Sequence, residues 1–96
     1  MQRIKIEKID ELKRKQLRIP DQPCNQSGWS VWECPPSQFD WHYSEVEKAY
    51  IYEGRVKVKT AQEEVEIQKG DFVTFPKDLS CTWHVLEKIR KVYTFE

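Results

Sequence analysis

The chain has 96 residues, in which 16 Lys and Arg balance 16 Asp and Glu. This length predicts one domain, and the absence of a basic excess argues against a nucleic-acid partner, because phosphates need cations. No apolar run approaches the roughly 18 residues of a membrane span, and the first eight residues lack the apolar core of a secretory leader, so we expect a cytoplasmic domain.

The first 26 residues are predicted to form an entry segment that precedes the main fold. Residues 4–6 alternate as in a short strand. Residues 8–18 are rich in helix formers, with Asp10 as a candidate N-cap, and predict one or two helical turns on the surface. The Pro-, Asn- and Gly-rich residues 20–28 predict a loop.

From residue 27 onward, apolar and polar side chains alternate with the period of two that is typical of β-strands. The expected strands cover residues 29–34, 39–43, 47–53, 55–60, 64–67, 72–75, 79–86 and 90–95. Gly54 is expected to separate two of these strands, and a turn is expected near Glu87–Lys88. The cations of residues 55–59 alternate against the anions of residues 64–66, which predicts an antiparallel pair.

Short strands separated by turns, with no helix between them, predict an all-β fold with an antiparallel sandwich or barrel. We expect a single domain over residues 1–96, in which residues 27–96 form the barrel. Cys24, Cys34 and Cys81 contain no C-x-x-C pair, so reduced thiols are expected, with a Cys24–Cys34 bridge as the alternative.

Two short patterns in this β region have a characteristic spacing. Glu47 is followed by six residues and then Gly54. Gly70-Asp71 is followed by Pro76, six positions after the glycine, and by Cys81 five positions later. With these patterns the chain resembles the cupin superfamily, and the resemblance implies a jelly-roll barrel.

Within the superfamily the chain is most similar to the small cupin domains of the ureidoglycine aminohydrolase type. The resemblance covers residues 27–96 and is carried by the aromatic stretch 39–43 and the ending 81–93. For an enzyme of this type it implies manganese-dependent hydrolysis of a ureido compound.

Metal-binding cupins place two histidines before the glutamate of the first motif and one more histidine in the second. Counting four residues back from Glu47 puts Asp40 and His42 at these positions, and Cys81 stands at the second-motif position. These four residues could hold a divalent metal such as Mn, Fe, Ni or Zn. Counting three residues back gives Trp41 and Tyr43 instead, which would not bind a metal.

Side chains alternate along a strand, so only one of these two sets can face the interior. Trp41 and Tyr43 suit a small core better than Asp40 and His42, because an unpaired buried aspartate costs several kcal/mol. We therefore expect an aromatic interior, a degenerate metal site and no metal cofactor, and we expect His42 and His84 to face outward.

The predicted site is a pocket that binds a small polar molecule. Its expected ligand-binding residues are Trp41, Tyr43, Glu47, Cys81 and Trp83. Glu47 is also the candidate catalytic residue, because a carboxylate in an apolar pocket is suited to general acid–base chemistry. A metal-dependent or acid–base enzyme related to ureidoglycine aminohydrolase is the alternative.

The second alternative is an interaction protein that forms a homodimer. Tyr50 and Tyr52 point away from Glu47 on their strand, and aromatic side chains are favoured at interfaces, so they are the expected dimer surface. Arg90 and Lys91 could offer one cation to the pocket, although ion pairing at its rim is the preferred interpretation.

Overall fold

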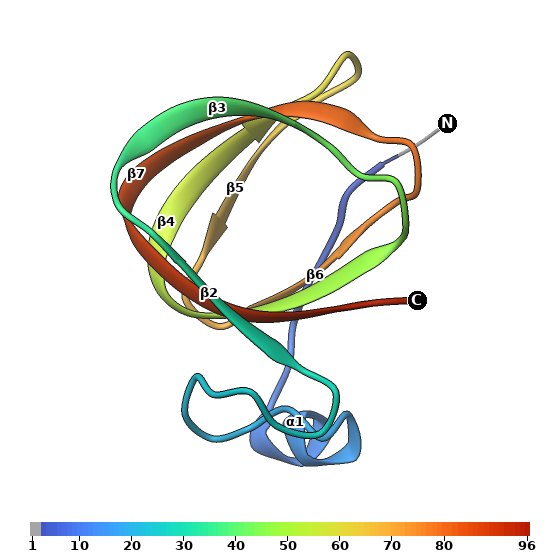
Figure 1. Ribbon diagram of the computed structural model, residues 1–96, viewed down its shortest axis with the longest axis vertical. Coiled ribbons are helices and arrows are strands. Elements are labelled where there is room, and N and C mark those ends of the chain that lie inside the picture. The colour runs from blue at the N-terminus through green and yellow to red at the C-terminus, as the bar shows by residue number, and fades with distance from the viewer. Residues whose placement is uncertain (1–2) are drawn as a thin grey trace.

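The computed structural model describes residues 3–96 and contains, in these residues, one helix and seven strands (Figure 1). The elements are β1 (Lys5–Lys8), α1 (Glu11–Gln16), β2 (Ser30–Cys34), β3 (Ser37–His42), β4 (Glu47–Lys59), β5 (Glu64–Gln68), β6 (Asp71–Phe75) and β7 (Ser80–Phe95). All strand pairs are antiparallel. The predicted all-β barrel is confirmed.

The two long strands β4 and β7 lie side by side and belong to both halves of the barrel (Figure 1). The first half of β4 pairs with β6 and with the end of β7, whereas its second half pairs with β5 and with the start of β7. In turn, β7 pairs first with β3 and then with β2, and β1 completes one edge against β6. The predicted charge ladder is present, with Lys57 opposite Glu66 and Lys59 opposite Glu64.

Two predicted chain breaks are wrong. Gly54 does not separate two strands, because β4 runs through it with register shifts against β7 on both sides. Likewise no turn forms at Glu87–Lys88, which lie inside β7. The barrel is closed by bending two long strands at a shared irregularity, and an irregularity of this kind is hard to tell from a turn in sequence.

The helix α1 begins where it was expected, since the Asp10 side chain accepts a hydrogen bond from Lys13 N at 2.8 Å. No residue of α1 is buried. Among the residues that the structure describes, no helix is long and apolar enough to cross a membrane. The expectation about a secretory leader concerned the first eight residues, and residues 1 and 2 of these lie outside the described part of the chain.

Apolar side chains pack on both faces of the sheet that contains β6, β4 and β7. The larger cluster fills the barrel interior, and a second cluster of Ile19, Trp29, Tyr50, Phe72 and Val92 lies between its outer face and the entry segment. Tyr50 is therefore buried, and the Tyr52 hydroxyl donates a hydrogen bond to Pro20 O. The placement of Tyr50 on a dimer surface is thus wrong, because the entry segment covers it, and Tyr52 beside it is partly buried in the same way.

Candidate functional site

A pocket of about 150 Å³ opens into the barrel between β3, the start of β4 and the end of β7. It is lined by Trp32, Phe39, Trp41, Tyr43, Glu47, Trp83, Lys91, Tyr93 and Phe95. Seven of these nine residues are aromatic, and the other two carry opposite charges. The lining therefore combines apolar walls with a single polar centre.

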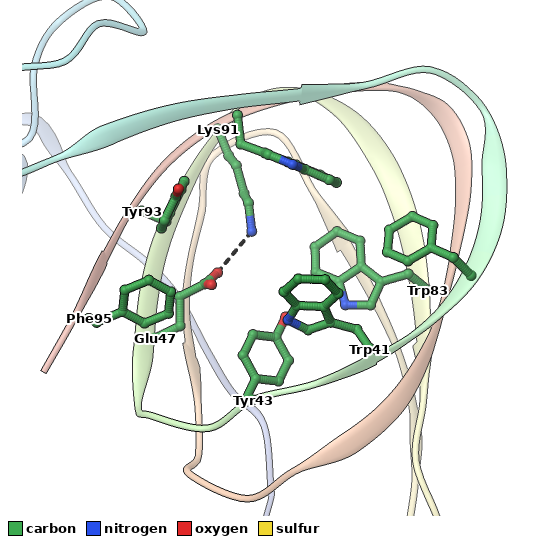
Figure 2. A pocket seen from close by; sticks show the side chains of 9 residues that line it. Trp41, Tyr43, Glu47, Trp83, Lys91, Tyr93 and Phe95 are labelled. Carbon is green, nitrogen blue, oxygen red and sulfur yellow. Dashed lines mark hydrogen bonds and ion pairs between the residues drawn. The ribbon is translucent and has the colours of Figure 1, made fainter.

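The polar centre is an ion pair between Glu47 on β4 and Lys91 on β7. Lys91 Nζ lies 2.8 Å from Glu47 Oε2, and both side chains are only 6% exposed. The ammonium group also lies between 4.8 and 5.9 Å from the centroids of four aromatic rings. Figure 2 shows Lys91 reaching down into the pocket to the Glu47 carboxylate. Both charges are thus compensated within the barrel, as buried charges must be.

The rings of the wall pack on one another in defined geometries. Tyr43 stacks on Phe75 at a centroid distance of 4.6 Å, and Phe39 stacks on Trp83 at 6.1 Å. Trp41 differs because it is 52% exposed and stands at the mouth of the pocket (Figure 2). A rigid wall and a half-exposed indole at the entrance are both suited to stacking on a flat ligand.

The Tyr43 hydroxyl stays protonated throughout the physiological range. Burial raises the pKa of Tyr43 well above its ordinary value, and the nearby Glu47 charge raises it further. The indole N–H of Trp83 acts in the opposite direction, although it does not reach hydrogen-bonding geometry. Tyr43 therefore offers the pocket a neutral hydroxyl that can donate a hydrogen bond.

The structure brings together four of the five side chains that the sequence assigned to the pocket: Trp41, Tyr43, Glu47 and Trp83. Cys81 is the exception. It is buried in the core next to Trp83 and borders a separate surface groove with Asp40 and His42. Cys81 does share a strand face with Trp83, as predicted from the sequence. Its side chain is short, however, and it does not line the same cavity.

The alternative metal-ligand set is divided between two places, because Asp40, His42 and Cys81 border the surface groove whereas Glu47 lies in the barrel pocket. Asp40 accepts a hydrogen bond from Thr82 at 2.8 Å, and His42 Nδ1 lies 2.8 Å from Ser80 Oγ, both on the outer face of β3. Among residues 3–96, no group of three or more His, Cys, Asp or Glu side chains could share a metal ion. The donor set of a metal-binding cupin therefore does not fit this pocket, in which the carboxylate is already bound by the Lys91 ammonium.

The Cys81 thiol is expected to be unreactive in the folded protein. Burial raises the pKa of Cys81 to about 11, so the reactive thiolate is scarce near neutral pH. Cys24 and Cys34 are free and partly exposed. Alkylation at pH 8 followed by mass spectrometry should label these two first, and Cys81 only after denaturation. Equal labelling of all three would contradict the burial.

The raised Cys81 pKa also gives a direction for stability in alkali. The folded-state pKa of about 11 exceeds the ordinary value of 9.0 for a thiol, so the neutral thiol is favoured by folding. This contribution is fully present below pH 9 and is lost as the pH rises through about 11. Replacing Cys81 with alanine should reduce the fall in stability over this interval, which urea unfolding at a series of pH values measures.

Sequence reasoning allowed Arg90 or Lys91 to offer one cation to the pocket but preferred ion pairing at the rim, and for Lys91 that preference is wrong. Arg90 is the residue that pairs at the rim, with Glu53 at 2.8 Å, whereas Lys91 points inward. Lys91 shares a strand face with Ile89 and Tyr93, whose side chains face the barrel, and this spacing was the sequence signal for an inward lysine. It was ambiguous because Val92 on the other face is also fully buried, under the entry segment.

Comparisons with known proteins place this geometry in a family. A family model described as the EutQ-like cupin domain matches residues 21–93. A DUF861-family protein from Thermotoga maritima has a solved structure that is 43% identical, with a TM-score of 0.88 over 98% of this chain and 100% of that one. The Clostridium difficile EutQ protein is 22% identical with a TM-score of 0.62, over 68% of this chain and 52% of that one, and shows the fold alone. No curated protein matches the chain.

Proposed function

The chain belongs to the EutQ-like cupin domain family, and on that premise we propose that it binds a small polar molecule in the pocket around Glu47. The cation at the carboxylate in this proposal is Lys91 rather than a metal ion. The observation that carries it is the buried 2.8 Å ion pair at the wall of an aromatic pocket. A pair that only filled the core would not need a cavity beside it.

A ligand screen tests the proposal directly. Three of the four tryptophans, Trp32, Trp41 and Trp83, line the pocket, so a ligand that enters it should change the indole fluorescence. The panel contains small amides, ureido compounds, amino acids and sugars, and a rise in melting temperature serves as the second readout. If no member of a broad panel changes either signal, the proposal is wrong.

Replacing Trp41 with alanine is expected to weaken the binding of any ligand found in this screen by about fivefold, because the indole at the mouth supplies about 1 kcal/mol of stacking. Trp41 is 52% exposed, so its loss should leave the melting temperature nearly unchanged. Leu12→Ala is the matched control, since Leu12 is 65% exposed on the remote helix α1. Equal affinity of the Trp41 variant and the wild type would place binding elsewhere.

Metal content separates this proposal from hydrolysis of the ureidoglycine aminohydrolase type. That finer relationship would require a metal centre, and the residues around Glu47 do not supply its ligands. Protein purified from medium supplemented with manganese, iron, nickel and zinc is expected to contain less than one equivalent of any of them. One equivalent of metal that disappears in Glu47→Gln would overturn the metal-independent proposal.

A homodimer is a second proposal, supported by a different observation. Trp41 and Phe95, both at the pocket, are 52% and 49% exposed. Two large apolar side chains at one rim are typical of an interaction surface. Light scattering measures the mass in solution, and Phe95→Asp should convert such a dimer into monomers.

A further inference from the structure

The charges of the pocket restrict the ligands that it can accept. Glu47 and Lys91 are the two charged side chains in its lining among residues 3–96, and each compensates the other at 2.8 Å. A ligand with a net charge therefore finds no free counter-charge there. Taking such a charge out of water costs more than one hydrogen bond returns. This observation favours a neutral ligand.

The unused hydrogen-bonding groups indicate what that ligand carries. Glu47 Oε2 accepts from Lys91, whereas no bond to the second carboxylate oxygen is found in the described chain, so this oxygen is available as an acceptor. Burial keeps the Tyr43 hydroxyl protonated, and no hydrogen bond of normal geometry to it is found among residues 3–96. The neighbouring Trp83 indole carries only an N–H donor, so it offers no acceptor for the hydroxyl hydrogen of Tyr43. Figure 2 shows Tyr43 and Glu47 on adjoining sides of the same space. One group donates and the other accepts.

The size of the pocket sets the scale of the molecule. A cavity of about 150 Å³ holds a molecule the size of benzene, with about six non-hydrogen atoms. We infer that the ligand is a neutral small carbonyl compound of the amide type, whose carbonyl oxygen accepts from Tyr43 and whose N–H donates to Glu47. This inference rests on the proposed function and deepens it, because it names the chemical class.

Three probes with the same carbon chain and different charges test the inference: butyramide, butyrate and butylammonium. Binding to the full chain is followed by indole fluorescence and by NMR chemical-shift changes at the residues of the pocket. Butyramide is expected to bind at least about tenfold more tightly than either ion, because only the amide leaves the charges of the pocket balanced.

Tyr43→Phe removes the donor and keeps the stacked ring. It is expected to weaken butyramide by about fivefold, the effect of one neutral hydrogen bond, without changing the weak binding of the two ions. Tyr52→Phe is the matched control, because the Tyr52 hydroxyl bonds Pro20 O outside the pocket. It should leave the butyramide affinity unchanged.

The outcomes separate the inference from the proposed function. If butyrate or butylammonium binds as tightly as butyramide, or if only charged members of the wider panel bind, the ligand class is wrong and the pocket still binds small molecules. The class is also wrong if Tyr43→Phe binds butyramide as the wild type does. If nothing in the panel binds, the proposed function fails and the inference fails with it.

Discussion

Replacing Gly54 with alanine is expected to lower the free energy of unfolding by about 3 kcal/mol or more. A Cβ atom at this position would overlap the Lys88 carbonyl oxygen and would lie 2.7 Å from Ile89 Cα. Both neighbours are backbone atoms of β7, so no side-chain rotation relieves the overlap. Gly54 also has a φ of +97°, a backbone conformation that residues with a Cβ atom rarely adopt. Urea unfolding followed by tryptophan fluorescence measures the loss.

Gly70→Ala separates the two causes. Gly70 has a similar φ of +91°, but no atom lies within 4 Å of the point that an added Cβ would occupy. Its replacement should therefore cost only the conformational penalty of about 1–2 kcal/mol. If the two alanine variants were equally stable, close contact between β4 and β7 would not be what demands glycine at the bend.

The sequence predicts the strands of this fold well and its bends poorly, for a physical reason. Alternation reports which side chains share a face of a strand, and it correctly placed Tyr50 on the face opposite Glu47. A bulge keeps the ladder going while it shifts the register, so Gly54 carries the same local signal as a turn. The difference lies in the contact with Lys88, which is distant in sequence and cannot be read from it.

The sequence brought three of the side chains of the candidate pocket together but left the position of its cation open. Trp41, Tyr43 and Glu47 were found because their spacing and alternation place them on one face, and the structure puts all three at one pocket. Arg90 and Lys91 were both candidates for a cation at the pocket, but the rim was preferred because lysine and arginine side chains are usually exposed. Only the tertiary position of Glu47, 44 residues earlier, makes the burial of Lys91 favourable.

Replacing Lys91 with methionine is expected to cost about 3–5 kcal/mol of stability, because it leaves Glu47 as an uncompensated buried charge. Methionine keeps the apolar length of the side chain, so the loss is not that of a cavity. Arg90→Met is the matched control: Arg90 pairs with Glu53 at the same 2.8 Å distance, but this pair lies at the exposed rim. It should change the free energy of unfolding by less than about 1 kcal/mol.

The double variant Glu47→Leu with Lys91→Met shows why the pair is there. When both charges of a buried pair are replaced by apolar groups, stability is often unchanged or rises by about 1–4 kcal/mol. We expect the urea midpoint of the double variant to be at least as high as that of the wild type. The double variant therefore still tests the role of the pair if Lys91→Met alone does not fold. It should nevertheless fail to bind butyramide, because Glu47 no longer accepts from the ligand. Stability retained with binding lost means that the pair serves recognition, whereas a double variant about 3 kcal/mol less stable would make the pair structural.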